Sequence, residues 1–150
     1  MPSRARRIAG DHVPSLLLVG SGAWIALLSA RDQHHAEAEA MFRAAASRRA
    51  RLLTTNLILA EVHTFVLFRA GIQPASHALE RIEASRLVAI EFATRAHHQR
   101  ARAWLEKLKD QRISYTDAVS FAVMQAAGCR TAMSFDHDFE TAGYVLWRPA

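Results

Sequence analysis

The sequence predicts an α/β fold, a three-layer α/β/α sandwich whose central sheet is mainly parallel. Short apolar runs bounded by turn residues, typical of buried strands, alternate with longer segments of helical periodicity. This alternation favours parallel strands whose two faces are both covered by helices. The 150 residues contain no internal repeat and no Pro/Gly-rich linker, so one domain is expected over residues 15–150.

Each element of this fold is predicted from local signals. Strands are expected where the apolar runs are short, at residues 15–19, 51–54, 86–92, 130–135 and 144–147. Helices are expected over the intervening periodic segments, at residues 23–28, 35–48, 57–70, 74–85, 95–108, 115–127 and 136–143. The expected N-caps are Asn56, Thr94 and Ser114, and the glycines expected at the helix ends are Gly71, Gly128 and Gly143.

Composition and charge narrow the class of protein and the kind of partner. The apolar runs are interrupted before they reach the ~18 residues that a membrane span needs, and the lone Cys129 fits a reducing cytoplasm. A formal net charge of +5 favours an anionic partner but does not distinguish RNA from an acidic protein or a membrane surface. Residues 1–14, which contain several arginines, are expected to be a disordered tail outside the fold.

A Gly-Ser-Gly break, Gly20–Gly22, follows the first predicted strand and has three possible explanations. It is not a dinucleotide-binding loop, because Ile25 stands where the third glycine belongs, and no Gly-Lys-Ser/Thr follows for a P-loop. A secretory signal peptide is disfavoured because the break interrupts the apolar segment. The cleavage site is also poor, because Leu28 stands two residues before Ala30, where a small residue is needed. The third explanation is a corner at a catalytic site.

Three carboxylates stand out by their places in the predicted elements. Glu61 lies on or beside the core-facing stripe of the most apolar helix, where a lone carboxylate is costly without a partner. Asp117 begins a helix, and Asp136 follows a strand, with Asp138 two residues further on. Each acid also has a structural explanation. Glu61 can pair with an arginine at the edge of the core, and Asp117 fits the spacing of a capping box that starts at Ser114. Asp136 or Asp138 can cap the short helix that follows.

These acids are expected to converge because the carboxyl ends of parallel strands meet at one edge of the sheet. Clustered carboxylates repel one another and so imply a cation, and hard oxygen ligands select Mg²⁺ or Mn²⁺. Such a site can orient water and stabilise charge in phosphodiester cleavage. Other kinds of site are less favoured, since the sequence has no HExxH, no Cys/His spacing for zinc and no GxSxG around a nucleophilic serine.

Four segments, spaced in order along the chain, resemble the motifs of a known family. They contain the sequences LLLVGSGAWIALL, TTNLILAEVHTF, ISYTDAVSFAV and AMSFDHDFETAGY. From about Leu16 to the C-terminus, the chain is similar to the PIN domain and, within that superfamily, to the VapC toxins of toxin–antitoxin pairs. The resemblance implies a Mg²⁺-dependent endoribonuclease that cleaves RNA in the cytoplasm. It also implies a homodimer that a small cognate antitoxin protein neutralises.

The resemblance also implies roles for individual residues. Glu61, Asp117 and Asp136 stand at the positions of the family's catalytic, metal-binding acids. The residues implied as accessory to them are Ser21, Thr116 and Asp138.

The resemblance breaks down at one position, Gly20. Family members carry a metal-binding aspartate there, followed by serine or threonine, whereas this chain has Gly20 followed by Ser21. The Gly-Ser-Gly is therefore interpreted as an Asp-Ser-Gly corner without its acid, and impaired catalysis is expected. Two explanations remain: a toxin disarmed by engineering or selection, which is favoured because the other acids persist, or a natural non-catalytic module that sequesters antitoxin or RNA.

Overall fold

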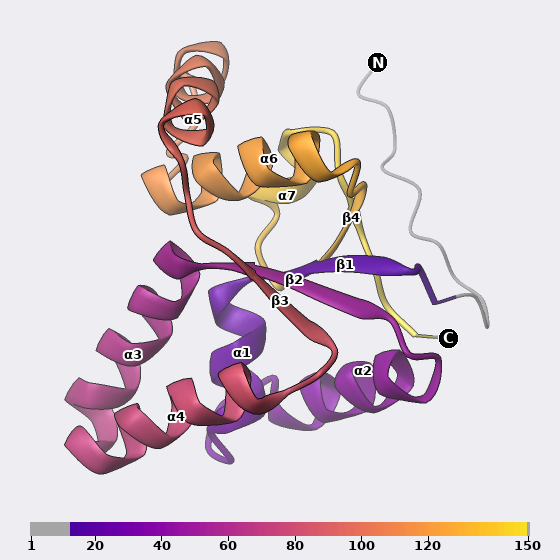
Figure 1. Ribbon diagram of the computed structural model, residues 1–150, viewed down its shortest axis with the longest axis vertical. Helices are drawn as coiled ribbons and strands as arrows, with labels where there is room; N and C mark the ends of the chain where they lie inside the picture. Colours follow the sequence, from indigo (N-terminus) through magenta and orange to yellow (C-terminus); the bar gives the residue numbers. More distant parts are fainter. Residues whose placement is uncertain (1–12, 150) are drawn as a thin grey trace.

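Five parallel strands form the central sheet of the computed structural model, which describes residues 13–149 (Figure 1). The strands are β1 (Leu16–Val19), β2 (Arg51–Thr55), β3 (Val88–Glu91), β4 (Thr131–Met133) and β5 (Val145–Leu146). Their order across the sheet is β3-β2-β1-β4-β5, and each neighbouring pair is parallel. The prediction of a parallel sheet is confirmed. All but the last two residues of the expected tail, residues 1–14, lie outside the described residues.

Helices cover both faces of this sheet and give the predicted three layers (Figure 1). One layer contains α1 (Ser21–Leu28), α2 (His35–Ser47), α3 (Asn56–Ala70) and α4 (Ile72–Ala84). The other layer contains α5 (Arg95–Lys107), α6 (Tyr115–Ala127) and α7 (Asp138–Thr141). None of the helices between residues 13 and 149 has the length and hydrophobicity that a membrane span requires.

The direction of winding reverses at β1, the central strand. The chain passes from β1 to β2 and β3 on one side, and returns to β4 and β5 on the other. In sheets of this kind, ligands bind outside the carboxyl ends of the strands, at the reversal point. Here that point lies between β1 and β4, where the backbone N–H of Gly20 donates to the carbonyl of Met133 at 3.0 Å. Gly20 and the residues that follow β4 are therefore neighbours.

Burial of α6 fixes the position of its first turn. Every residue from Ala118 to Met124 is buried, because α6 packs along α5 and its apolar residues share the core with those of the strands. A helix that is apolar all round is stable only in such an enclosed position. The packing around Phe121 is aromatic, with the Phe139 ring edge-on at 5.2 Å and Trp104 edge-on at 5.5 Å. The N-terminal end of α6 is thereby held at the carboxyl edge of the sheet.

Several predicted boundaries differ from the structure. Helix α1 begins at Ser21, two residues earlier than expected, α4 begins at Ile72 rather than residue 74, and α7 is shorter than residues 136–143. Pro74 is tolerated inside α4 because the first turn of a helix needs no intrahelical N–H donor.

One predicted helix cap was wrong. Thr55, not Asn56, caps α3, since its hydroxyl accepts the N–H of Ile58 at 3.1 Å. The amide oxygen of Asn56 instead accepts the N–H of Ala93 at 2.9 Å, and so ties α3 to the loop after β3. The predicted caps Thr94 and Ser114 are confirmed.

Candidate active site

Three carboxylates converge at the carboxyl edge of the sheet. Asp117 in the first turn of α6, Asp136 after β4 and Asp138 at the start of α7 each place one oxygen within 4.8 Å of the others. The structure thus brings Asp117 and Asp136 together, as the sequence predicted, and adds to them Asp138, which was expected only as an accessory. Three oxygens at this separation are suited to a hard divalent cation.

Hydrogen bonds within the loop after β4 orient two of these acids. The hydroxyl of Ser134 accepts the N–H of Asp136 at 3.0 Å, and the Asp136 carboxylate accepts the N–H of Asp138 at 2.9 Å. Asp136 therefore accepts an N–H at the start of α7 while also facing the other acids, although the N-cap of α7 is His137 rather than either aspartate. Both functions are compatible because a carboxylate has two oxygens and several lone pairs.

Asp117 is the most strongly perturbed acid in the cluster. The Ser114 hydroxyl accepts the backbone N–H of Asp117 at 3.1 Å, which is one half of the expected capping box, but the Asp117 carboxyl hydrogen-bonds to Asp136. Burial raises the pKa of Asp117 to about 7, and the negative charges of Asp136, Asp138 and Glu61 contribute in the same direction. Burial is also the main cause of a raised pKa at Asp138.

Glu61 lies beside this cluster, and it is exposed rather than buried. The buried residues of α3 are Ile58 and Val62, so of the two expected positions, on or beside the core-facing stripe, Glu61 takes the one beside it. Partial burial raises the pKa of Glu61, a hydrogen bond from Ser21 opposes that shift, and the charge of Asp136 adds to it. Ser21 is thus the hydrogen-bond partner of Glu61, and the alternative of an arginine partner finds no support among the described residues.

Gly20 is the N-cap of α1 and faces the loop that carries Asp136. Its backbone is extended, with φ −72° and ψ 160°, a conformation that any residue adopts. A Cβ atom at this position would lie 3.2 Å from the hydroxyl oxygen of Ser134 and 3.4 Å from its Cβ. A side chain at position 20 would therefore point toward the loop that carries Asp136. Thr116 lies half-buried in the first turn of α6, and its accessory role stays a prediction.

Sequence reasoning missed the side chains that support the loop after β4. Arg148 donates to the Ser134 carbonyl at 2.6 Å, and its guanidinium lies 5.1 Å from the centre of the Phe135 ring. His34 stacks on Phe135 at 4.2 Å, with 9° between the rings. For Ser134, a hydroxyl two residues before an acid was an available signal of a turn. No local pattern could have revealed Arg148 or His34, because both reach the loop from distant parts of the chain.

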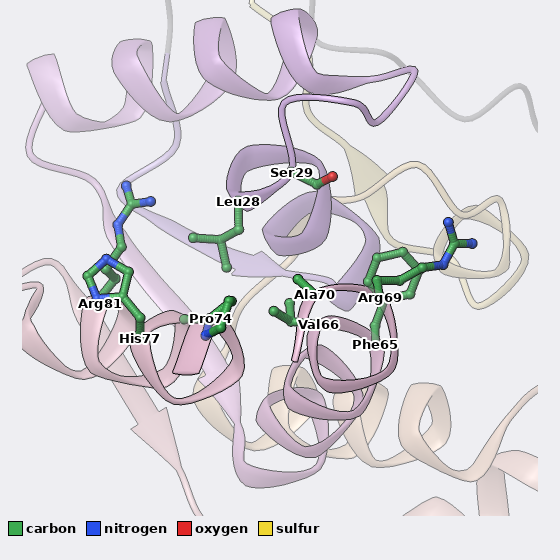
Figure 2. A pocket seen from close by; sticks show the side chains of 10 residues that line it. Leu28, Ser29, Phe65, Val66, Arg69, Ala70, Pro74, His77 and Arg81 are labelled. Atoms are coloured by element: carbon green, nitrogen blue, oxygen red, sulfur yellow. The ribbon is translucent and has the colours of Figure 1, made fainter. Parts of the chain in front are cut away.

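A separate apolar pocket of about 180 Å³ lies between α1, α3 and α4 (Figure 2). It is lined by Leu28 of α1, Phe65 and Arg69 of α3, and Pro74 and Arg81 of α4, among others. It contains none of the clustered acids. Phe65 is one helical turn beyond Glu61, however, so the pocket and the acidic site lie along the same helix.

Because of Asp117, we expect the metal-free protein to lose stability as pH rises from 5.5 to 8.5. The ordinary pKa of this group is 3.8, and its folded pKa is about 7. Between pH 3.8 and about 7, the folded state holds a proton that the unfolded state has released. The stability that this proton contributes to the folded state is therefore lost as pH rises through 7. After allowance for solvent screening, the loss is about 1–2 kcal/mol. Urea unfolding in EDTA at several pH values measures it.

The matched control for this experiment is Asp117→Asn, which removes the titrating group. We expect its unfolding free energy to depend less on pH over the same range. A free energy of unfolding that rises with pH in the parent, or the same decline in both proteins, would contradict the assignment.

Comparison with known proteins gives the family of this fold and site. The PIN domain family model matches residues 17–143, and the chain therefore belongs to the PIN-domain family. The 23S rRNA-specific endonuclease VapC20 of Mycobacterium tuberculosis, from two strains, is 34% identical over 134 residues, which cover 89% of this chain and 99% of the relative. Within the family, the chain is of the VapC toxin type and is a ribonuclease by descent.

Solved structures agree with this assignment. The crystal structure of M. tuberculosis VapC20, described as a Sarcin-Ricin loop cleaving toxin, has a TM-score of 0.77 at 34% identity and covers 86% of this chain and 96% of its own. VapBC2 from Rickettsia felis, bound to a DNA fragment from its promoter, has a TM-score of 0.66 at 13% identity, covering 89% of this chain and 98% of its own. The second similarity reflects the fold alone.

Proposed function

We propose that this chain is a Mg²⁺- or Mn²⁺-dependent endoribonuclease of the VapC type whose own activity is impaired because Gly20 stands in place of a metal-binding aspartate. The observation that carries the proposal is the convergence of Asp117, Asp136 and Asp138 at the reversal point of the sheet, with Gly20 facing the loop that carries Asp136. Burial, with added repulsion from the neighbouring acids, raises the pKa of Asp117 to about 7. A divalent cation would replace the proton on this carboxyl group and relieve the repulsion.

The residues present fit a hard cation, because their donors are all carboxylate oxygens. We propose that Asp117, Asp136 and Asp138 hold it, and that a bound cation would stabilise the charge that develops on the scissile phosphate. Glu61 is exposed at the rim and is hydrogen-bonded by Ser21. In that position it is suited to orient a water molecule and accept its proton.

We propose a structured RNA loop as the substrate, by analogy with VapC20, which is a Sarcin-Ricin loop cleaving toxin. The test incubates the chain and its Gly20→Asp variant with an RNA hairpin that carries this loop, and with a hairpin of scrambled loop sequence. Each is assayed with Mg²⁺ and with EDTA. Metal-dependent cleavage confined to the first hairpin supports the proposal, whereas equal cleavage in EDTA counts against it.

A non-catalytic binding module is the second candidate function, and the absence of a carboxylate at Gly20 favours it. In that case the chain would bind antitoxin or RNA without cutting. A binding module needs the surface of the fold but not the charge of the acids, so variants that neutralise an acid distinguish the two candidates.

We also propose a cognate antitoxin as the partner, and a homodimer as the VapC type implies. The apolar pocket between α1, α3 and α4 begins one turn beyond Glu61 and offers a seat for an apolar segment of the antitoxin (Figure 2). An arginine that follows this segment would reach the acids and form a bidentate ion pair with them. Light scattering of the purified chain tests the homodimer.

We expect an antitoxin variant in which this arginine is replaced by alanine to bind at least about tenfold more weakly and to inhibit less, because the truncation leaves carboxylates unpaired. Isothermal titration and inhibition of the Gly20→Asp enzyme measure both effects. Replacement of an antitoxin arginine outside this segment is the control. If the tight complex survives the first replacement with affinity and inhibition unchanged, the proposed arginine contact is wrong.

A further inference from the structure

A second concave surface, distinct from the acids but at the same edge of the sheet, has the chemistry of a nucleic-acid base platform. It has a volume of about 450 Å³ and lies where the starts of α3, α5 and α6 meet the loop after β3. Its lining includes Leu57, Arg95, His98 and Tyr115. Tyr115 is two residues before Asp117 in the first turn of α6, and Leu57 is one turn before Glu61 on α3. A ligand in this concavity would therefore be next to the acidic site.

One exposed aromatic ring, Tyr115, lines this surface, and a second, Phe92, is adjacent in sequence to one of its lining residues. Tyr115 is 42% exposed, and Phe92, next to the lining residue Ala93, is 67% exposed. The orientation of Tyr115 is held by His98, whose Nδ1 lies 2.7 Å from the Tyr115 hydroxyl and whose ring meets the Tyr115 ring edge-on at 5.7 Å. An aromatic ring that stays exposed beside a concavity offers a flat face on which a planar group can stack.

The charge at this surface comes from a side chain rather than from a helix terminus. The first turn of α5 is closed by a capping box, in which the Thr94 hydroxyl accepts the N–H of His97 and the His97 ring accepts the N–H of Thr94. Two amides at this terminus, those of Thr94 and His97, are therefore engaged in the cap. Arg95 is exposed and lines the concavity, so its guanidinium is the group available to a phosphate.

We propose that Phe92, Arg95 and Tyr115 form a platform that stacks unpaired bases of the RNA and contacts the adjacent phosphate, with His98 positioning the Tyr115 ring. This inference rests on the proposed ribonuclease function. Unpaired RNA bases stack on aromatic side chains, whereas a duplex hides them. The acids of the active site repel phosphates, so stacking through uncharged faces supplies affinity that the cleavage site itself lacks. The platform thus selects loops over helices.

The test measures binding of a fluorescent RNA hairpin to the parent chain by anisotropy, with Ca²⁺ or EDTA in the buffer. We expect Phe92→Leu and Tyr115→Leu each to weaken binding about 5- to 100-fold, because each loses one stacked base. Tyr115→Phe keeps the ring and should change binding by less than about threefold. Arg95→Gln should reduce the slope of log affinity against log salt by about 1.

Phe68→Leu is the matched control, because Phe68 is 83% exposed on α3 and lies outside the concavity. It should bind RNA as the parent does. A hairpin with abasic sites in its loop is the second control. The leucine variants and the parent should bind this hairpin with the same affinity. Circular dichroism confirms that each variant is folded.

Two outcomes overturn the platform. If both leucine variants bind RNA as tightly as the parent, the platform does not exist. The same follows if the variants lose equal affinity for intact and abasic loops. If the Gly20→Asp enzyme cleaves RNA while these variants bind normally, the platform fails and the ribonuclease function stands. If the parent binds no RNA and the Gly20→Asp chain cuts none, both fail together.

Discussion

Replacing Gly20 by aspartate is expected to raise metal-dependent RNA cleavage at least about 100-fold above the parent. The position lies at the reversal point of the sheet, and a side chain there points toward Ser134 and the loop that carries Asp136. A carboxylate at position 20 would add a direct ligand, and loss of even an indirect supporting group typically costs 10–100-fold in metal affinity or activity. Initial rates on the sarcin–ricin hairpin, with Mg²⁺ and with EDTA, measure the gain.

The structure accommodates this substitution with only a local adjustment. The backbone at Gly20 is extended, so aspartate meets no strain of the kind that a positive φ imposes. Aspartate is also a favoured N-cap, and Gly20 provides no side-chain cap for α1 at present. The close contact is with the Ser134 hydroxyl at 3.2 Å, which must shift by a few tenths of an ångström. Added repulsion among four acids should lower the melting temperature in EDTA slightly, and Mg²⁺ or Mn²⁺ should raise it more than in the parent.

Gly20→Asn is the matched control, because it has the same shape and capping ability as aspartate without the charge. It should fold like Gly20→Asp and cut no faster than the parent. If Gly20→Asp folds, binds no Mn²⁺ and cuts nothing, the nuclease proposal fails. If it melts far below the parent, the double variant Gly20→Asp/Ser134→Ala relieves the contact, and inactivity of that folded variant also counts against the proposal.

The fold could be predicted from the sequence because strands and helices leave local periodic signals. The run Leu16–Val19 contains no polar residue, as is typical of a strand buried on both faces, and the run at residues 51–54 contains two buried leucines. The order of the strands left no such signal, since it depends on which edges pair in space. Helix boundaries were less accurate where two helices share a glycine, as α3 and α4 do at Gly71, because the end of one pattern hides the start of the next.

The acids of the site could be predicted for a different reason. Asp117 and Asp136 follow from topology, because the carboxyl ends of parallel strands share one edge. The exposure of Glu61 could not be predicted, since its neighbours Leu57, Phe65 and Phe68 look like a core stripe in sequence. In the structure Phe68 is 83% exposed, so the apolar residues of α3 do not all face the core. A periodic pattern cannot distinguish a face that packs on the sheet from one left for a partner.

Asp117→Asn in the Gly20→Asp background is expected to abolish cleavage, with a loss of about 10³-fold or more, and to change RNA binding by less than about threefold. The asparagine keeps the shape of the side chain and the Ser114 cap, which uses only the backbone N–H. It removes the charge that a metal ion requires. Because burial and three neighbouring acids raise the pKa of Asp117, its neutralisation should also stabilise the metal-free protein above pH 7.

Asp110→Asn is the control, because Asp110 is an exposed acid in the segment before α6 and lies outside the cluster. It should leave cleavage, RNA binding and the stability of the metal-free protein unchanged. The combination expected for Asp117→Asn, lower activity with higher metal-free stability and unchanged RNA binding, distinguishes a metal-binding acid from a structural one. Neutralising a structural acid would instead lower the stability of the protein, because the hydrogen bonds of such an acid hold the fold together. Equal losses of RNA binding and cleavage would mean that Asp117 shapes the RNA surface, and the non-catalytic binding module would then be the better description of the chain.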